Sequence, residues 1–261
     1  MTTTATEARE ATLVADSHVV LEGAGVPVRR ALPSAIATYD LVDPFLLLDD
    51  AQIPTEMSGE GFPPHPHRGF EIITYLLAGS MNHVVDDDEP SQVQAGGLLR
   101  ITAGRGMWHG EGPGERSAEP MRGIQLWVNL PRAEKQVDPS YDIIAPEDIP
   151  ERQEGDAKVR VLVGEGSPAQ LRTPAMYLDV SLQTGGSYST SVPSEFQGLA
   201  FVMAGEAHFG ANATKAAAGQ LVVMGPGSSI QVSDATPDTQ LILLAGQPHG
   251  EVPRWRGPYV D

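Results

Sequence analysis

Short runs of apolar residues, separated by turn signals, dominate the chain. The run Phe45–Leu48 ends at two aspartates, and the run Ile72–Leu77 ends at Ala78-Gly79. Residues 124–129 and 176–182 alternate between apolar and other side chains with a period of two, which is the period of a β-strand. Amphipathic helical patterns stay shorter than about three turns. The pattern therefore predicts an all-β fold made of many short strands.

Short sequence segments of the first half also recur in the second half. Residues 75–79 (Tyr-Leu-Leu-Ala-Gly) resemble residues 201–205 (Phe-Val-Met-Ala-Gly) at an offset of 126. Residues 95–99 resemble residues 218–222 at an offset of 123. Two matches in the same order with nearly equal offsets favour an internal duplication.

The duplication divides the chain into two barrels with short flanking segments. We expect a mobile N-terminal tail at residues 1–17 and a first barrel at 18–135. A connector rich in Pro, Asp and Glu follows at 136–157, and a second barrel at 158–261. The C-terminal tail is expected to pack back onto the first half. Two barrels in one chain already bury what paired subunits would bury, which favours a monomer.

The net charge and the absence of cysteine exclude several classes of binding partner and of metal site. The net charge is −17, which argues against direct binding to nucleic acid or anionic lipid. The acidic run Asp86–Glu89 is expected to be a solvated hairpin tip. We expect a cytoplasmic protein, because the chain has neither a signal-peptide pattern nor an apolar run near the ~20 residues of a membrane span. Without cysteine, a transition metal would need histidine and carboxylate ligands.

Two spaced pairs of polar residues are candidates for such ligands. His65 and His67 flank a proline, so both imidazoles project from one face of an extended segment. His109 and Glu111 form a second pair with the same spacing, and His109 comes 42 residues after His67. One such pair alone is more often a surface feature. Two pairs on facing strands would gather four ligands around one point, with Trp108 pointing away into the core.

These residues lie in motifs that resemble known ones. The spacing of Gly59, His65, His67, Glu71 and Gly79 resembles the first cupin motif, and Gly104-x-Gly106-x-x-His109 resembles the second, with glycine where proline is usual. Over residues 24–261 the chain resembles the pirin family, on the strings at 43–49 (Asp-Pro-Phe-Leu-Leu-Leu-Asp), 65–71 (His-Pro-His-Arg-Gly-Phe-Glu), 102–106 (Thr-Ala-Gly-Arg-Gly) and 257–260 (Gly-Pro-Tyr-Val). The resemblance implies a bicupin, with two tandem barrels of the double-stranded β-helix type.

The resemblance also implies which residues hold the metal, namely His65, His67, His109 and Glu111. Glu71 fills the position that supplies a ligand in many other cupins; we expect it not to be a ligand here but to lie beside the ligands or to have a structural role. His83 is expected either to line the cavity, as a proton shuttle or substrate contact, or to be a hydrogen-bonded structural residue. The second barrel is expected to be metal-free, because the repeat offsets place Ser191, Pro193, Val232 and Asp234 at the ligand positions. His208 is interpreted as a core or surface residue.

The resemblance implies one divalent metal ion, with Fe(II) favoured and Mn, Ni, Cu or Zn compatible with the same ligands. Members of the family cleave the flavonol quercetin with O2. In that chemistry the metal lowers the pKa of the 3-hydroxyl group, Glu111 takes its proton, and the ring opens with loss of carbon monoxide. The alternative is a regulatory protein that binds a transcription factor or a metabolic enzyme, with the metal as a redox-sensitive switch. A third hypothesis is that the protein is a vestigial bicupin that binds a metal ion without catalytic or regulatory activity.

Overall fold

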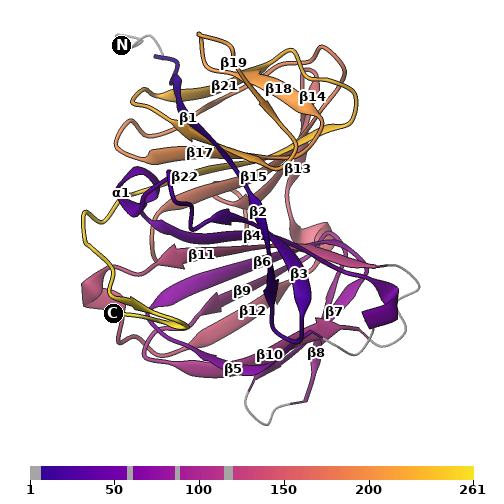
Figure 1. The fold of residues 1–261 in the computed structure, drawn as a ribbon, viewed down its shortest axis with the longest axis vertical. Coiled ribbons are helices and arrows are strands. Elements are labelled where there is room, and N and C mark those ends of the chain that lie inside the picture. The colour runs from indigo at the N-terminus through magenta and orange to yellow at the C-terminus, as the bar shows by residue number, and fades with distance from the viewer. Residues whose placement is uncertain (1–6, 58–60, 86–88, 115–119) are drawn as a thin grey trace.

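The computed structural model of the chain describes residues 7–57, 61–85, 89–114 and 120–261. Gly59 of the first motif, the acidic residues Asp86–Asp88 and the first six residues of the expected tail lie outside the described residues. The described elements are mostly strands, and they form two barrels stacked one above the other (Figure 1). The short helical elements are α1 (Tyr39–Val42), η1 (Thr55–Met57), η2 (Arg132–Glu134) and η3 (Pro146–Asp148).

The first barrel consists of a seven-stranded and a four-stranded antiparallel sheet. The larger sheet has the order β12 (Ser140–Ile144), β9 (Leu98–Thr102), β6 (Phe70–Ala78), β11 (Met121–Asn129), β4 (Phe45–Ile53), β3 (Val26–Leu32), β2 (His18–Glu22). The smaller sheet has the order β5 (Phe62–His67), β10 (Met107–Pro113), β7 (Ser80–Val85), β8 (Ser91–Gln94).

The second barrel repeats this arrangement. Its larger sheet has the order β1 (Ala11–Asp16), β20 (Gln220–Met224), β17 (Gln197–Ala204), β22 (Thr239–Gly246), β15 (Ala175–Leu182), β14 (Ala157–Val163), β13 (Glu151–Glu154). Its smaller sheet has the order β16 (Tyr188–Ser191), β21 (Ser229–Ser233), β18 (Glu206–Phe209), β19 (Thr214–Ala217). Strand for strand, the two barrels correspond, and the all-β bicupin prediction is confirmed.

The expected tail and connector differ from the structure. Within residues 1–17, β1 pairs along its length with β20, so the N-terminal segment belongs to the second barrel (Figure 1, indigo). Within residues 136–157, β12 pairs with β9 and completes the first barrel. The two strands occupy equivalent edges of the two larger sheets. Their backbone groups are paired across long sequence separations, which no local sequence pattern reveals.

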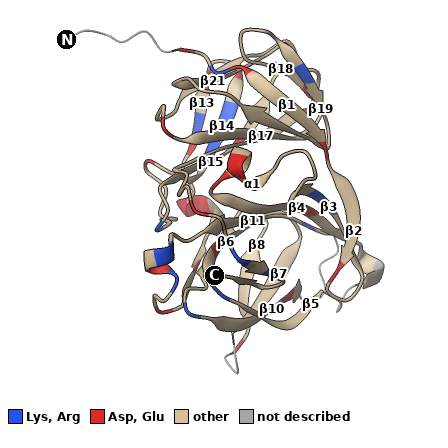
Figure 2. Ribbon diagram, turned by 60° about the vertical axis from the view of Figure 1, so that its left-hand side comes forward, with Lys and Arg blue, Asp and Glu red and all other residues tan. Residues whose placement is uncertain are grey.

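The larger sheets of the two barrels pack against each other. Successive side chains of a strand point to opposite faces of its sheet, so one face lines the interior of its own barrel and the other faces the second barrel. On β6, Ile72 faces the interior of the first barrel, whereas Ile73 and Tyr75 join a cluster shared with Phe201 and Leu244 of the second barrel. The interior of the second barrel is a separate apolar cluster. Figure 2 shows acidic and basic residues interspersed over both barrels. No helix in the described ranges is long and apolar enough to span a membrane.

Candidate metal centre

The edge strand β5 places two of the candidate ligands. Three of its six residues are proline, and because proline donates no hydrogen bond to a neighbouring strand, such a segment is confined to a sheet edge. On its one paired side, His65 lies directly opposite His109 of β10. His67 projects from the same face two residues later. The motif spacing and the strand register thus bring three imidazoles to one face of the smaller sheet.

The histidine group (His65, His67 and His109) is compact. The ring centroid of His65 lies 4.6 Å from the ring centroids of both His67 and His109. The centroids of His67 and His109 are 5.0 Å apart. One nitrogen from each ring lies within 4.8 Å of the others. His67 and His109 are buried, and His65 is partly exposed. Among the described residues, these three alone form such a group of potential ligands.

The hydrogen bonds of the three rings leave nitrogen lone pairs free. Nδ1 of His65 lies 2.8 Å from the carbonyl oxygen of Pro63, so this nitrogen carries the proton and Nε2 is free to coordinate. Nδ1 of His109 lies 3.2 Å from Nε2 of His83. The Nε2 atom of His109 has no hydrogen-bond partner in the described part of the chain. Both ring nitrogens of His67 are buried and unpartnered there. Buried polar atoms are rarely left unpaired, so the arrangement fits a bound metal ion.

Burial keeps these imidazoles uncharged. Desolvation, reinforced by the neighbouring His65, lowers the pKa of His67 to about 3. Desolvation and the three other histidines lower the pKa of His109 to about 2, and desolvation lowers that of His83 to about 4. The pKa of His65 is also lowered, mainly by burial. Neutral imidazole is the form that binds a metal, so the group is ready for one at neutral pH.

The metal-free protein is expected to lose stability in mild acid. Between pH 6.5 and 4 the unfolded chain protonates histidines that the folded chain keeps neutral, so the free energy of unfolding falls as the pH falls. Glu111, whose pKa is raised to about 7, acts in the opposite direction but with one proton only. Urea unfolding of metal-free protein at pH 7.0, 6.0, 5.5 and 5.0 should show a loss of roughly 2 kcal/mol per pH unit near pH 5.5. A flat profile would contradict the buried, neutral state, and His67→Ala should reduce the slope.

Glu111 lies on β10 after a bulge that shifts the pairing with β5 between His109 and Glu111. Its carboxylate is buried inside the barrel and accepts hydrogen bonds from Thr74 Oγ1 (3.2 Å) and Gln125 Nε2 (3.0 Å). Burial raises its pKa to about 7, and the two hydrogen bonds oppose the rise. The carboxylate is not part of the compact histidine group. Its assignment as a ligand stays a prediction.

Thr74 and Gln125 were not predicted as site residues, although the sequence carried weak signals for both. Gln125 stands on the polar face of the alternating segment 124–129, and Thr74 is a hydroxyl residue within an apolar run. Gln125 Oε1 accepts a hydrogen bond from Trp127 Nε1 (3.0 Å) while its amide group donates to Glu111. These two partners therefore fix which atom of the Gln125 amide is the nitrogen and which is the oxygen.

A cavity of about 480 Å³ opens beside the histidine group. This volume lies within the range of small-molecule sites, roughly 300–1,000 Å³. His65 and His67 line it, together with the aromatic rings of Phe62, Trp127 and Trp255. The lining residues are Glu22, Gly23, Arg30, Leu47, Asp49, Phe62, Pro63, His65, His67, Gln125, Trp127, Trp255, Gly257 and Pro258.

The C-terminal segment forms one wall of this cavity, beside β5 (Figure 1, yellow). It folds into β23 (Trp255–Arg256) and β24 (Tyr259–Val260), and Tyr259 bridges to Arg68. The buried ammonium group of Lys135 donates to the carbonyl oxygens of Val260 (3.1 Å) and Gly69 (2.8 Å). Gly69 has φ +89°, and a Cβ there would lie 1.8 Å from the Val260 oxygen. Only glycine allows the segment to cross this turn.

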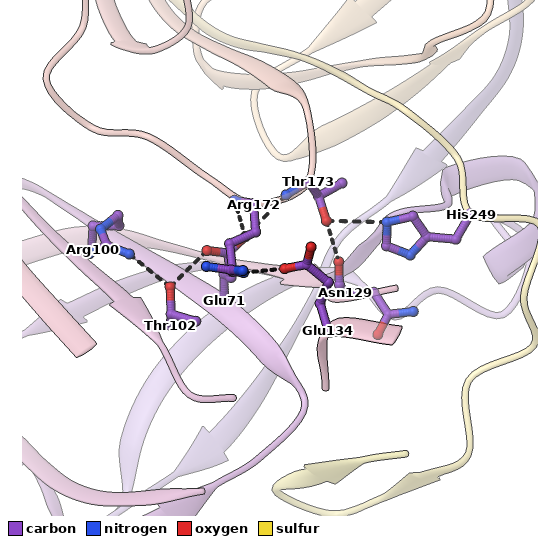
Figure 3. Close-up of polar contacts among 8 residues, drawn as sticks. All are labelled: Glu71, Arg100, Thr102, Asn129, Glu134, Arg172, Thr173 and His249. Atoms are coloured by element: carbon purple, nitrogen blue, oxygen red, sulfur yellow. Dashed lines mark hydrogen bonds and ion pairs between the residues drawn. The ribbon is translucent and has the colours of Figure 1, made fainter. Parts of the chain in front are cut away.

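Two other residues singled out in the sequence are Glu71 and Trp108. Glu71 faces the second barrel, because β6 alternates and residues 70, 72 and 74 take the inner face. Its carboxylate accepts hydrogen bonds from the backbone N–H groups of Arg172 and Thr173 (Figure 3). Of the two roles expected for Glu71, these contacts favour the structural one. Trp108, expected in the core, is 52% exposed.

His83 contacts a candidate ligand but does not line the cavity. It is 1% exposed, hydrogen-bonded to His109 and in edge contact with the ring of Tyr141 (centroids 5.0 Å apart). Through the hydrogen bond it orients the His109 ring. Of the two roles left open, the structure supports the hydrogen-bonded one.

In the second barrel the positions equivalent to the three histidines carry no histidine, and the position equivalent to Glu111 carries Asp234. Ser191 and Val232 lie on β16 and β21, which correspond to β5 and β10. The interior is filled by apolar side chains, including Val232 and Phe209. His208 lies at the surface beside Asp234, with Nδ1 3.1 Å from the carboxylate.

Two tandem barrels of matching strand order, one of them with a histidine group on its smaller sheet, define a bicupin. The chain belongs to the pirin family: residues 25–128 match the family described as Pirin, and residues 177–261 match the Pirin C-terminal cupin domain.

Individual relatives cover almost the whole chain. Pirin-1 of Arabidopsis thaliana is 38% identical over 247 residues, covering 92% of this chain and 83% of the relative. Human pirin is 36% identical over 262 residues, covering 97% and 87%. Among solved structures, a quercetin 2,3-dioxygenase from Acinetobacter baumannii is 28% identical with a TM-score of 0.87, covering 97% of this chain and 92% of that one.

Proposed function

We propose that this chain is a metal-dependent dioxygenase of the quercetinase type, which cleaves a flavonol-like substrate with O2. The observation that carries the proposal is the convergence of three uncharged imidazoles, two of which (His65 and His67) line a cavity together with aromatic rings. A cavity of this kind suits a flat ring system and can keep most of it away from water. The likeness to a bacterial quercetin 2,3-dioxygenase, at 28% identity, supports the same reading.

His65, His67 and His109 would hold the ion, with Glu111 as the fourth ligand from the same strand as His109. Nitrogen and carboxylate donors without thiolate suit Fe(II), which the family resemblance favours, and equally Mn, Ni, Cu or Zn. When bound, the ion would supply a Lewis acid that lowers the pKa of a substrate hydroxyl group.

The protein's own groups would position the substrate and handle its proton. Trp127 and Trp255, whose ring centroids lie 6.1 Å apart, would together form an aromatic wall against which a flat ring packs. The carboxylate of Glu111 would accept the hydroxyl proton as a general base. The hydrogen bonds from Thr74 and Gln125 would hold that carboxylate in place.

Oxygen uptake with quercetin tests this proposal. Stripped protein would be reconstituted separately with Fe(II), Mn(II), Ni(II) and Cu(II). We expect metal-dependent uptake with release of carbon monoxide, and a loss of about a hundredfold or more in Glu111→Gln, since a general base contributes roughly 10²–10⁴-fold. If no metal supports uptake in protein with a full complement of the ion, the proposal fails. The regulatory alternative, with a protein partner, would then be favoured.

A further inference from the structure

Three charged residues in the cavity wall have no part in metal binding. Arg30 of β3 donates to both carboxylate oxygens of Asp49 on β4, from Nε (2.9 Å) and Nη2 (2.7 Å). Its Nη1 lies 2.8 Å from Glu22 at the end of β2. All three residues line the same cavity as His65 and His67. We call them the carboxylate cluster (Glu22, Arg30 and Asp49).

The cluster has a net negative charge and spare hydrogen-bond acceptors. Two carboxylates face one guanidinium, and three of its five N–H groups are already used. The carboxylate oxygens keep more unused lone pairs than the guanidinium keeps unused N–H groups. Asp49 is only 5% exposed, and the side chain of Glu22 is 41% exposed. The cluster therefore extends from the buried wall of the cavity to its exposed side.

A substrate that fills the cavity meets this cluster in addition to the histidine group. The same cavity is also lined by apolar and aromatic groups, among them Leu47, Phe62 and Trp127. A hydroxyl group near the cluster can donate to an unused carboxylate lone pair. A carboxylate there would face net negative charge in a partly buried site, where like charges repel strongly.

We propose that the carboxylate cluster determines the specificity of the cavity: it accepts hydrogen bonds from hydroxyl groups of a neutral aromatic substrate and rejects substrates that carry a carboxylate there. This inference rests on the proposed function for the identity of the reaction. The recognition itself needs no metal.

Ligand binding can be measured without turnover, by quenching of tryptophan fluorescence. Two of the three tryptophans, Trp127 and Trp255, line the cavity, and Trp108→Phe would remove the exposed third. The probes would be quercetin, 3-hydroxyflavone, which lacks the other hydroxyl groups, and a flavone carboxylic acid. The cavity variants would be Glu22→Gln and Asp49→Asn. The first changes a half-exposed side chain and keeps the test valid if the second fails to fold.

Asp50→Asn is the matched control. Asp50 is the next residue of β4 and also pairs with an arginine through two bonds, to Arg122 (3.0 and 2.8 Å), but it does not line the cavity.

We expect wild-type protein to bind quercetin about tenfold more tightly than 3-hydroxyflavone, as hydrogen bonds to charged groups allow, and the carboxylic acid more weakly than both. Both cavity variants should reduce the hydroxyl preference and bind the acid more tightly, whereas Asp50→Asn should match the wild type. An unchanged order of affinities in both variants would overturn the inference, as would tight binding of the acid to the wild type. If binding behaves as expected but no metal supports oxygen uptake, the proposed function fails and the inference stands.

Discussion

His67→Ala is expected to abolish metal binding while the fold stays intact. His67 is 3% exposed and contacts both His65 and His109, so its removal leaves two imidazoles for the ion. Loss of a group that merely orients a ligand costs 10–100-fold in metal affinity, and loss of a ligand itself should exceed about a hundredfold. The ring makes no hydrogen bond in the described part of the chain, so its removal leaves no partner unpaired. Destabilisation of the metal-free protein should stay near 1–2 kcal/mol, from lost packing against Phe70 and Trp127.

Metal content and thermal unfolding together measure this effect. Metal should raise the Tm of the wild type, because the ion binds the folded chain only, and should leave the Tm of His67→Ala unchanged. His208→Ala is the matched control, because His208 lies in the second barrel, at the surface, where it pairs with Asp234. Full metal stoichiometry in His67→Ala would remove this histidine from the ligand set. Loss of metal in His208→Ala would contradict the expectation that the second barrel binds no metal.

The histidine group could be predicted from sequence because two short-range rules suffice for it. Residues i and i+2 of a strand share a face, and prolines restrict β5 to an edge, where a single neighbour fixes its register. The same rules did not place Glu111 relative to the histidines, since the bulge before it and its bonds to Thr74 and Gln125 depend on three strands at once.

The wall of the cavity and the sheet edges could not be predicted, because they depend on contacts between distant segments. Trp255 reaches the cavity only because the C-terminal segment crosses the turn at Gly69, with Lys135 bonded to both. β1 and β12 looked like tail and connector because short edge strands have little periodicity of their own. In each case a backbone partner far away in sequence decides the structure.

Glu71→Ala is expected to lower the free energy of unfolding by about 3–5 kcal/mol without changing metal stoichiometry. The carboxylate is fully buried and accepts hydrogen bonds from Thr102 Oγ1 (2.8 Å) and from the backbone N–H groups of Arg172 (2.9 Å) and Thr173 (3.4 Å) (Figure 3). Thr102 belongs to the first barrel, whereas residues 172 and 173 precede β15 of the second. Alanine would leave these donors without their acceptor at the contact between the barrels.

A graded series separates this structural role from a role at the metal. Glu71→Gln keeps the shape and one acceptor, and burial raises the pKa of Glu71, so removal of the charge offsets part of the loss; we expect about 1–2 kcal/mol. Glu134→Ala serves as the control, because Glu134 forms an exposed ion pair with Arg172 in the same network, and such pairs contribute about 0–1 kcal/mol. Urea unfolding and metal analysis of the three variants would be compared. If Glu71→Ala lost metal but kept wild-type stability, Glu71 would act beside the ligands, as its position in the motif suggests, and its contact with the second barrel would be incidental.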